Sequence, residues 1–267
     1  GFVYAISLDS GKLIWIKNHK IPIKSNIKIF ENKIFLIDQD NQIFCLNVKD
    51  GSKIWNIFSI SSFIKSQDLM SLAVSRKGNL VAVNSSADLF NINVDNGNVY
   101  WATNTSASLY TDVADFYKSS EIVISGEEII FSSATSIFSY DLKTGFVNWE
   151  IEASSVAAPI IDGKHIFFVT ENGYFIIIDK VTGKIISSNN ILKILKKKKQ
   201  KTKITGFIMG SGKLYSVTLN GNLIVSSAVS GKVEYFKKIG DPIITAPIIN
   251  DGRLYILTEN SRIIGFN

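Results

Sequence analysis

The sequence predicts an all-β protein, a β-propeller built from four-stranded antiparallel blades. Three observations support this fold class. A glycine is followed four residues later by a tryptophan in four places, which end at Trp15, Trp55, Trp101 and Trp149. Each copy follows an apolar, strand-like run, and a recurrence of this kind indicates an array of like supersecondary units. The apolar positions are mostly Ile, Val, Phe and Tyr, which favour strands over helices.

The repeat continues past the four tryptophans. Two degenerate copies place Ser187 and Tyr235 where the tryptophan would stand. We expect each tryptophan to fill the space between adjacent twisted sheets, whereas a ligand-stacking role would require aromatic rings that converge on a central channel. Each repeat glycine is expected to adopt a positive φ in a hairpin turn. The repeat glycines, separated by 40, 46, 48, 38 and 48 residues, are Gly11, Gly51, Gly97, Gly145, Gly183 and Gly231.

Each repeat contains a hairpin, which is two apolar runs around a polar turn. Residues 33–48 form the first such pattern. A short strand before the hairpin and the run that ends on the tryptophan complete a set of four strands, as in a propeller blade. We expect further hairpins at 79–94, 128–142, 165–180, 213–228 and 253–267, and complete sets around 22–58, 69–103, 120–151, 156–189 and 204–238.

Both ends of the chain carry incomplete sets. Residues 1–17 supply only a third and a fourth strand, and residues 244–267 supply the first three strands without a fourth. Closing a ring with strands from both ends would leave the strand from Phe2 to Leu8 unused. We therefore expect a single propeller domain over 1–267, with about six to seven blades, that lacks the first blades of a longer protein. An unusual closure, in which this strand packs elsewhere, is the alternative.

Composition limits the classes of function. The net charge is +6, and much of the excess lies between Lys193 and Lys203. A basic run can bind phosphate-rich partners, but no aromatic residues alternate with these lysines, so we expect a solvated loop and no nucleic-acid binding. The single Cys45 cannot form an internal disulfide and is predicted to be a small buried residue. No apolar run approaches the roughly 20 residues that span a bilayer.

The sequence offers little for catalysis. His19 and His165 are its two histidines, and they lie in different repeats. Two isolated histidines make neither a zinc site nor a persuasive catalytic base. We therefore predict no catalytic residue, no cofactor and no metal ligand. The aspartates are mostly turn residues that we expect to accept bonds from backbone N–H groups; examples are Asp9, Asp50, Asp95 and Asp141.

The repeat resembles the pyrroloquinoline-quinone-like repeat, which quinoprotein alcohol dehydrogenases share with the BamB family. The chain is similar to the BamB family over essentially its whole length, most closely over 210–267. The resemblance implies an eight-bladed parent with a signal peptide and a lipid-modified cysteine, at the periplasmic face of the outer membrane of a Gram-negative bacterium. Because this chain lacks both the early blades and that cysteine, we expect an N-terminally truncated member of an alphaproteobacterial type.

The resemblance also implies a partner. Members of this family are non-catalytic scaffolds of the outer-membrane β-barrel assembly (BAM) complex and dock onto its barrel-forming subunit BamA through loops at one end of the propeller. One such loop corresponds to the segment with Phe63, Ile64 and Lys65, and a second corresponds to the segment with Asp112 and Asp115. An apolar anchor flanked by charge on rigidly held loops is typical of a partner-binding patch. Exposed strand edges or a concave surface would serve unfolded outer-membrane substrates.

Two other functions stay open from the sequence. A fragment of a quinone-dependent dehydrogenase would share the repeat, because the repeat by itself does not transfer activity. Such enzymes hold the quinone with calcium-binding acidic and amide side chains and typically with adjacent cysteines, and this chain has one cysteine and no evident acidic cluster. A generic periplasmic propeller that binds protein or carbohydrate is the third possibility, with the lysine segment as an anion site.

Overall fold

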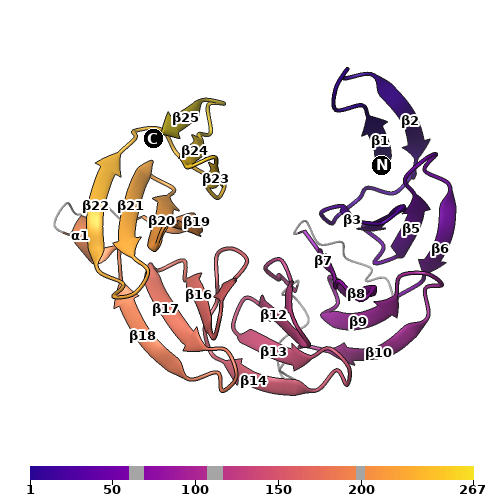
Figure 1. Cartoon of the computed structure of the whole chain (residues 1–267), viewed down its shortest axis with the longest axis horizontal. Helices are drawn as coiled ribbons and strands as arrows, with labels where there is room; N and C mark the ends of the chain where they lie inside the picture. Colours follow the sequence, from indigo (N-terminus) through magenta and orange to yellow (C-terminus); the bar gives the residue numbers. More distant parts are fainter. Residues whose placement is uncertain (60–68, 107–116, 197–201) are drawn as a thin grey trace. The chain divides into compact units, whose positions relative to one another are not determined.

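The computed structural model describes residues 1–59, 69–106, 117–196 and 202–267. These residues form 25 strands and one four-residue helix (Figure 1). The all-β prediction is confirmed, and all six predicted hairpins are present with ends within two residues of the predicted ones. The chain divides into two compact units, Gly1–Ala134 with Tyr140–Val147 and Thr135–Ser139 with Asn148–Asn267.

Each complete sheet contains four strands that are consecutive in the chain and neighbours in the sheet, named A to D below. The A–B and C–D turns therefore lie at one end of a sheet, and the B–C turn lies at the other. A two-stranded sheet precedes the first complete one. The strands of the first three sheets are β1 (Phe2–Ile6) and β2 (Leu13–Asn18); β3 (Lys28–Phe30), β4 (Lys33–Ile37), β5 (Ile43–Asn47) and β6 (Lys53–Ile57); and β7 (Ser71–Val74), β8 (Asn79–Val83), β9 (Asp88–Asn93) and β10 (Val99–Asn104).

The remaining sheets follow the same order of strands, except that the last one stops after strand C. The boundary between the two units lies within the sheet β11–β14. The strands are β11 (Val123–Ser125), β12 (Glu128–Ser132), β13 (Ile137–Asp141) and β14 (Val147–Ile151); β15 (Ile160–Asp162), β16 (His165–Val169), β17 (Tyr174–Asp179) and β18 (Ile185–Asn190); β19 (Ile204–Gly210), β20 (Lys213–Thr218), β21 (Asn222–Ser227) and β22 (Val233–Lys238); and β23 (Ile248–Asn250), β24 (Arg253–Leu257) and β25 (Ile263–Phe266).

The repeat tryptophans join neighbouring sheets, as predicted. Each indole Nε1 donates a hydrogen bond to the carbonyl of the residue that directly follows strand C of the next sheet. Trp55, for example, lies 3.0 Å from the Val94 oxygen and is buried beside Phe35. The four bonds run from Trp15 to Val48, Trp55 to Val94, Trp101 to Leu142 and Trp149 to Lys180.

The repeat glycines are required for two reasons. The sequence predicted the first, a positive φ, but not the second, a close approach of the neighbouring tryptophan. All six have a positive φ, for example +76° at Gly97 and +73° at Gly145. In addition, a Cβ at Gly97 would lie 2.9 Å from the Trp55 ring, and one at Gly145 would lie 2.7 Å from the Trp101 ring. Glycine therefore lets the C–D turn of one sheet accept the tryptophan of the preceding sheet.

The C–D turns are longer than two-residue hairpins. The glycine N–H bonds the carbonyl four residues earlier, as between Gly51 and Asn47, and the register of the strands shifts beside the turn. Asp50 and Asp141 accept bonds from backbone N–H groups, as predicted. Asp95 differs, because the side chain of Asn93 accepts the bond in that turn.

The hydrophobic core lies between neighbouring sheets. One cluster joins the sheets β3–β6 and β7–β10, and its fully buried members include Phe35, Ile43, Leu72 and Leu80. Cys45 belongs to this cluster, and burial raises the pKa of its thiol to about 12, which agrees with the prediction of a small buried residue. Nearly continuous burial along strand B, as in β4 and β8, explains why this strand reads as a nearly unbroken apolar run in the sequence.

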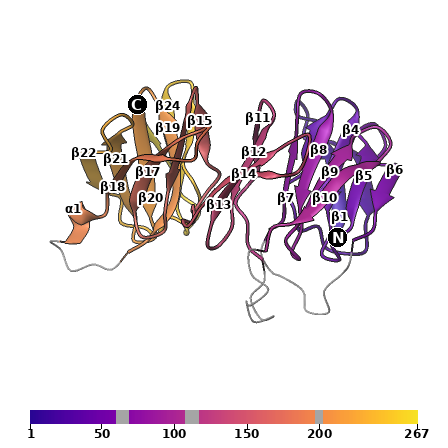
Figure 2. The ribbon, with the colours of Figure 1, turned by 90° about the horizontal axis from the view of Figure 1, so that it is seen from below.

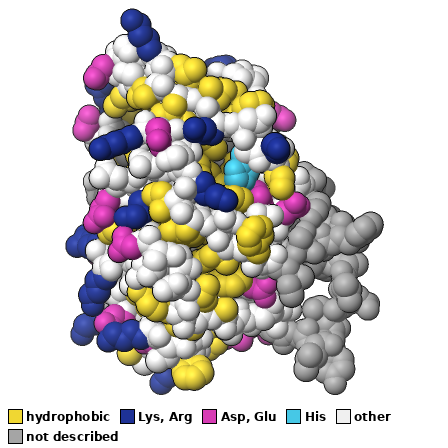
Figure 3. All heavy atoms as spheres, turned by 90° about the vertical axis from the view of Figure 1, so that its right-hand side faces the viewer, with side chains coloured by type: hydrophobic (Ala, Val, Ile, Leu, Met, Phe, Trp, Pro, Cys, Tyr) yellow, Lys and Arg dark blue, Asp and Glu magenta, His cyan; other side chains and the backbone are white. Residues whose placement is uncertain are grey.

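The two-stranded sheet β1–β2 is buried on one face only. Val3 packs with Leu36 and Leu46 of the next sheet. Phe2 and Tyr4 of β1 and Ile14 of β2 are more than half exposed. Figure 3 shows yellow apolar patches among blue Lys and Arg side chains on the side of the molecule where β2 and β6 lie in Figure 1.

Candidate functional site

The five side chains predicted to bind a partner lie outside the described residues. Phe63, Ile64 and Lys65 belong to the connection 60–68, and Asp112 and Asp115 belong to the connection 107–116. Their placement is therefore untested, and they stay predictions. The structure does describe the residues on either side of both connections.

Both connections join the same end of the sheet β7–β10. The first leads into the start of β7, and the second follows the end of β10. The two strands run in opposite directions, so the start of one and the end of the other lie at the same end of the sheet, which faces down in Figure 2. The B–C turn 84–87 lies at this end too. The sequence did not reveal that one sheet carries both loops.

Hydrogen bonds hold the ends of the second connection. Thr105 N donates to the Ala87 carbonyl at 2.8 Å, and the Thr105 hydroxyl lies 2.7 Å from the hydroxyl of Tyr117. The two residues flank 107–116, so this bond closes the base of the loop. Asn104 adds bonds of 2.9 Å to the Ser86 carbonyl and 2.8 Å to Asp88 Oδ1. The loop therefore leaves the sheet from a fixed base.

The first connection is held in a similar way. Asn84 Nδ2 donates to Ser59 Oγ at 3.0 Å on the strand β6 side. On the strand β7 side, Met70 N donates to the Lys24 carbonyl at 2.6 Å. Large apolar side chains stand exposed at both ends of the loop, because Phe58 is 75% exposed and Leu69 is 58% exposed. Exposed apolar residues next to a fixed loop base are typical of a protein-binding surface.

The B–C turns of neighbouring sheets are also tied together. Asn41, in the turn between β4 and β5, accepts a bond of 2.8 Å from Ser85 Oγ and donates one of 3.1 Å to Ser86 Oγ. Asn41 is buried and has a φ of +63°. Its amide can satisfy donors and acceptors on the next turn at once, so the two turns form one rigid end.

A buried contact between a carboxyl and an imidazole lies at the same end. Asp38 Oδ2 is 3.4 Å from His19 Nε2, and the Asp38 side chain is fully buried. Its Oδ1 accepts bonds from the backbone N–H groups of Asp40 and Gln42 at 2.9 and 3.0 Å. Burial raises the pKa of Asp38, although the two backbone bonds and His19 lower it in part. The sequence showed His19 only as an isolated histidine and did not reveal this partner, which is 19 residues away in sequence.

Asp38 should make the folded protein more stable as the pH falls, which is the opposite of the usual effect of a carboxyl group. A carboxyl whose folded pKa is raised contributes stability that is fully present below its unfolded pKa and is lost as the pH rises through its folded pKa. Wild type should therefore gain stability relative to Asp38→Asn as the pH falls from about 7 to about 4. Urea unfolding of both proteins at several pH values measures the difference.

Asp50→Asn provides a control of opposite sign. Backbone and side-chain bonds from Ser52 lower the pKa of Asp50, so its contribution is present at higher pH and is lost as the pH falls. Wild type should lose stability relative to Asp50→Asn as the pH falls further, from about 4 to about 2, because the folded pKa lies below the usual value of about 3.9. Parallel pH profiles for wild type and Asp38→Asn would contradict the role given to the buried carboxyl.

The lysine-rich segment is only partly described. Its first residues form α1 (Lys193–Lys196), and residues 197–201 lie outside the described part. The expectation of a loop is thus wrong for 193–196, because the buried Leu192 and Leu195 anchor this turn of helix. Lys203, at the other end, forms an ion pair of 2.7 Å with Glu171.

The described residues offer neither a metal-binding cluster nor a membrane-spanning helix. No group of three or more His, Cys, Asp or Glu side chains in this part of the chain could hold a metal ion. None of the helical residues described forms a segment long and apolar enough to cross a membrane. His165 is the first residue of β16 and is exposed.

Two solved structures resemble this one in their fold. BamB from Moraxella catarrhalis superposes with a TM-score of 0.84 at 13% identity, over 99% of this chain and 78% of that protein. The C-terminal WD40 domain of Sif2 superposes with a TM-score of 0.72 at 11% identity, over 96% of this chain and 71% of that one. These likenesses show a β-propeller fold, so each four-stranded sheet is a propeller blade.

Sequence comparison agrees with the fold. The outer membrane protein assembly factor BamB of Moranella endobia is 20% identical over 281 residues, which cover 96% of this chain and 68% of that protein. BamB of Yersinia pestis is 23% identical over 275 residues, which cover 99% of this chain and 58% of that protein. A family profile described as outer membrane protein assembly factor BamB matches residues 1–189 and 195–267. The chain therefore belongs to the BamB family of β-propellers with pyrroloquinoline-quinone-like repeats.

Proposed function

We propose that this chain is a non-catalytic scaffold of the machinery that assembles β-barrel proteins in the outer membrane. In this role it binds a BamA-like barrel protein at the periplasmic face of the membrane. The observation that carries the proposal is the family match over nearly the whole chain. The loops 60–68 and 107–116 provide the contact, with Phe63 and Ile64 as apolar anchors.

The geometry of the blade β7–β10 supports this use of the loops. A partner-binding loop is effective when its base is already ordered, because less conformational entropy is then lost on binding. The bonds of Thr105 to Ala87 and Tyr117, and of Asn84 to Ser59, order the bases of both loops. Since both loops start from one end of one blade, a single partner surface can contact both.

Capture of the barrel protein tests the proposal. A tagged full-length protein should co-purify a BamA homologue from solubilised outer membranes. Replacing Phe63, Ile64 and Lys65 together by serine should reduce the captured amount at least about tenfold, because truncating central interface residues costs about 2 kcal/mol or more. Asp112→Asn with Asp115→Asn should also reduce capture, with a stronger effect at low ionic strength.

Matched controls lie at the other end of the blades, on C–D turns. Phe146→Ser removes an aromatic side chain that is 75% exposed, and Asp9→Asn removes an exposed carboxylate. Both variants should capture the homologue as wild type does. Failure of the wild-type protein to capture it, or equal losses in the controls, would refute the proposal.

A further inference from the structure

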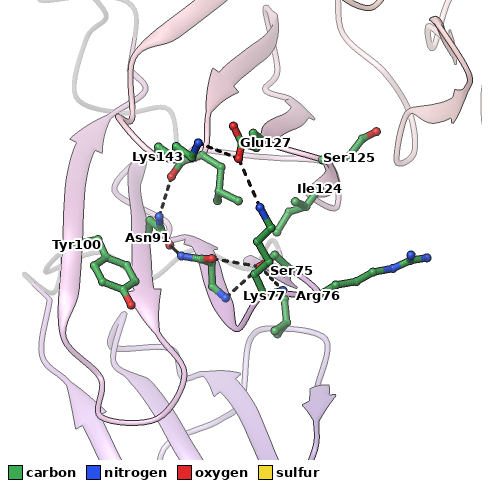
Figure 4. Close-up of a pocket in the computed structure, with 13 residues that line it drawn as sticks. Ser75, Arg76, Lys77, Asn91, Tyr100, Ile124, Ser125, Glu127 and Lys143 are labelled. Atoms are coloured by element: carbon green, nitrogen blue, oxygen red, sulfur yellow. Dashed lines mark hydrogen bonds and ion pairs between the residues drawn. The ribbon is translucent and has the colours of Figure 1, made fainter.

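A cavity of about 900 Å³ lies between the A–B turn of blade β7–β10 and the A–B and C–D turns that follow β11 and β13 (Figure 4). It is at the opposite end of the blade from the start of β7 and the end of β10. Its floor is apolar, with Val74, Ile124 and Leu142, and Tyr100 of strand β10 lines one side. A cavity of this size is in the range that accommodates a small ligand or a few side chains of a partner.

The cavity has an excess of positive charge. Arg76, Lys77 and Lys143 line it, against one carboxylate, Glu127. Lys143 Nζ lies 2.9 Å and Lys77 Nζ 3.5 Å from Glu127 Oε1, and Figure 4 shows both side chains directed at this carboxylate. Arg76 extends away from Glu127, on the side of the cavity opposite Tyr100 in this view. Three cations and one anion leave two positive charges.

The arrangement of strands in a blade does not require charged residues around such a cavity. Unit 2 has a cavity of about 650 Å³ at the same position between the blades β15–β18 and β19–β22. The first residue of strand B, the fourth of strand C and the second of strand D line both cavities. At four equivalent positions the cavity of unit 2 is lined by uncharged residues. Ile177 stands where the first cavity has Asn91, Ile186 where it has Tyr100, Gly212 where it has Glu127, and Val229 where it has Lys143.

The polar lining of the first cavity is also fixed in place. Asn91 is 2% exposed, and its Nδ2 donates to the Leu142 carbonyl at 2.7 Å. Its Oδ1 accepts a bond of 3.2 Å from Asn79, and Ser75 Oγ in turn accepts the Asn79 N–H at 3.0 Å. A buried amide is costly unless it is bonded in this way. These polar side chains are therefore ordered before any ligand arrives.

We infer that this cavity binds an acidic and apolar segment of a partner polypeptide, with a Glu or Asp carboxylate at Lys77 and Lys143 and an aromatic or aliphatic side chain against Tyr100 and Ile124. Ammonium and guanidinium groups form strong, charge-assisted bonds with carboxylates. The two lysines already hold one carboxylate, that of Glu127. At Glu127 the two lysines leave one positive charge, so the local charge balance favours a singly charged group over a doubly charged phosphate.

Calorimetric titration of the full-length protein with blocked hexapeptides tests this inference. We expect acetyl-(Glu-Phe)₃-amide to bind at low ionic strength, and acetyl-(Gln-Phe)₃-amide and acetyl-(Glu-Ser)₃-amide to bind at least about tenfold more weakly. The double variant Lys77→Gln with Lys143→Gln should bind the first peptide at least about tenfold more weakly than wild type does. Both lysines are more than half exposed, so the double variant should fold, which circular dichroism checks.

Lys184→Gln is the matched control, because Lys184 is exposed on the C–D turn of blade β15–β18 and is not among the residues that line this cavity. It should bind the first peptide as wild type does. Equal affinity for the Glu and Gln peptides, unchanged affinity in the double variant, or displacement of the peptide by an equal concentration of inorganic phosphate would each overturn the inference. The result is independent of BamA capture, because the cavity lies at the opposite end of the blade from the strand ends that lead to residues 60–68 and 107–116.

Discussion

Trp55→Ala is expected to lower the free energy of unfolding by about 3–5 kcal/mol, the range for removing a large buried aromatic side chain. Trp55 is 9% exposed, packs on Phe35 and donates to the Val94 carbonyl. Alanine would leave a void between the blades β3–β6 and β7–β10 and would leave the Val94 oxygen without this donor. Urea denaturation followed by far-ultraviolet circular dichroism measures the loss without relying on tryptophan fluorescence.

Trp55→Phe separates the contribution of the apolar contact from that of the hydrogen bond to Val94. Phenylalanine keeps most of the apolar contact but cannot donate to Val94, so we expect a smaller loss of about 1–3 kcal/mol. If Trp55→Ala unfolds within about 0.5 kcal/mol of wild type, which is the range of ordinary surface substitutions, the tryptophan is not the contact that holds the blades together.

Gly97→Ala should cost about 2–5 kcal/mol. A φ of +76° costs a residue with a Cβ about 1–2 kcal/mol, and overpacking adds about 1–3 kcal/mol, because the new Cβ would lie 2.9 Å from the Trp55 ring. The same denaturation experiment measures the loss. In the double variant Gly97→Ala with Trp55→Ala, the new Cβ no longer meets the indole, so the overpacking disappears. The loss of unfolding free energy in the double variant should therefore be smaller than the sum of the losses in the two single variants.

Gly11→Ala is the control for backbone strain alone. Gly11 has a similar φ of +66°, and its Cβ would have no atom within 4 Å. We expect a loss of about 1–2 kcal/mol for this variant. Equal losses for Gly11→Ala and Gly97→Ala would show that contact with the indole does not contribute to the requirement for glycine.

The strands were predictable because two local signals agree. Alternating or continuous apolar runs mark strands B and C, and the Gly and Trp of each repeat mark the C–D turn and strand D. The hairpin predicted at 33–48 is β4 and β5, and the incomplete sets predicted at both ends are the two-stranded and three-stranded sheets. Local pattern sufficed because each blade pairs only strands that are consecutive in the chain.

Contacts between turns of different blades were not predictable from local pattern. Asp38 meets His19 only after folding, and Asn41 bonds Ser85 and Ser86, which are 44 and 45 residues away. The cationic cavity likewise combines Lys77 and Lys143 from different blades. An alignment of the repeats within the chain offers one signal, since charged residues at Glu127 and Lys143 stand where another repeat has Gly212 and Val229.

The contacts between successive blades are not equally strong. Ser187 stands where the indole of blade β15–β18 would be, and in its place Asn189 Nδ2 donates to the Ser230 carbonyl at 3.1 Å. An array whose members touch only their neighbours transmits cooperativity through each such junction. We therefore expect the junction after β18 to be weaker than the junctions that a buried indole closes.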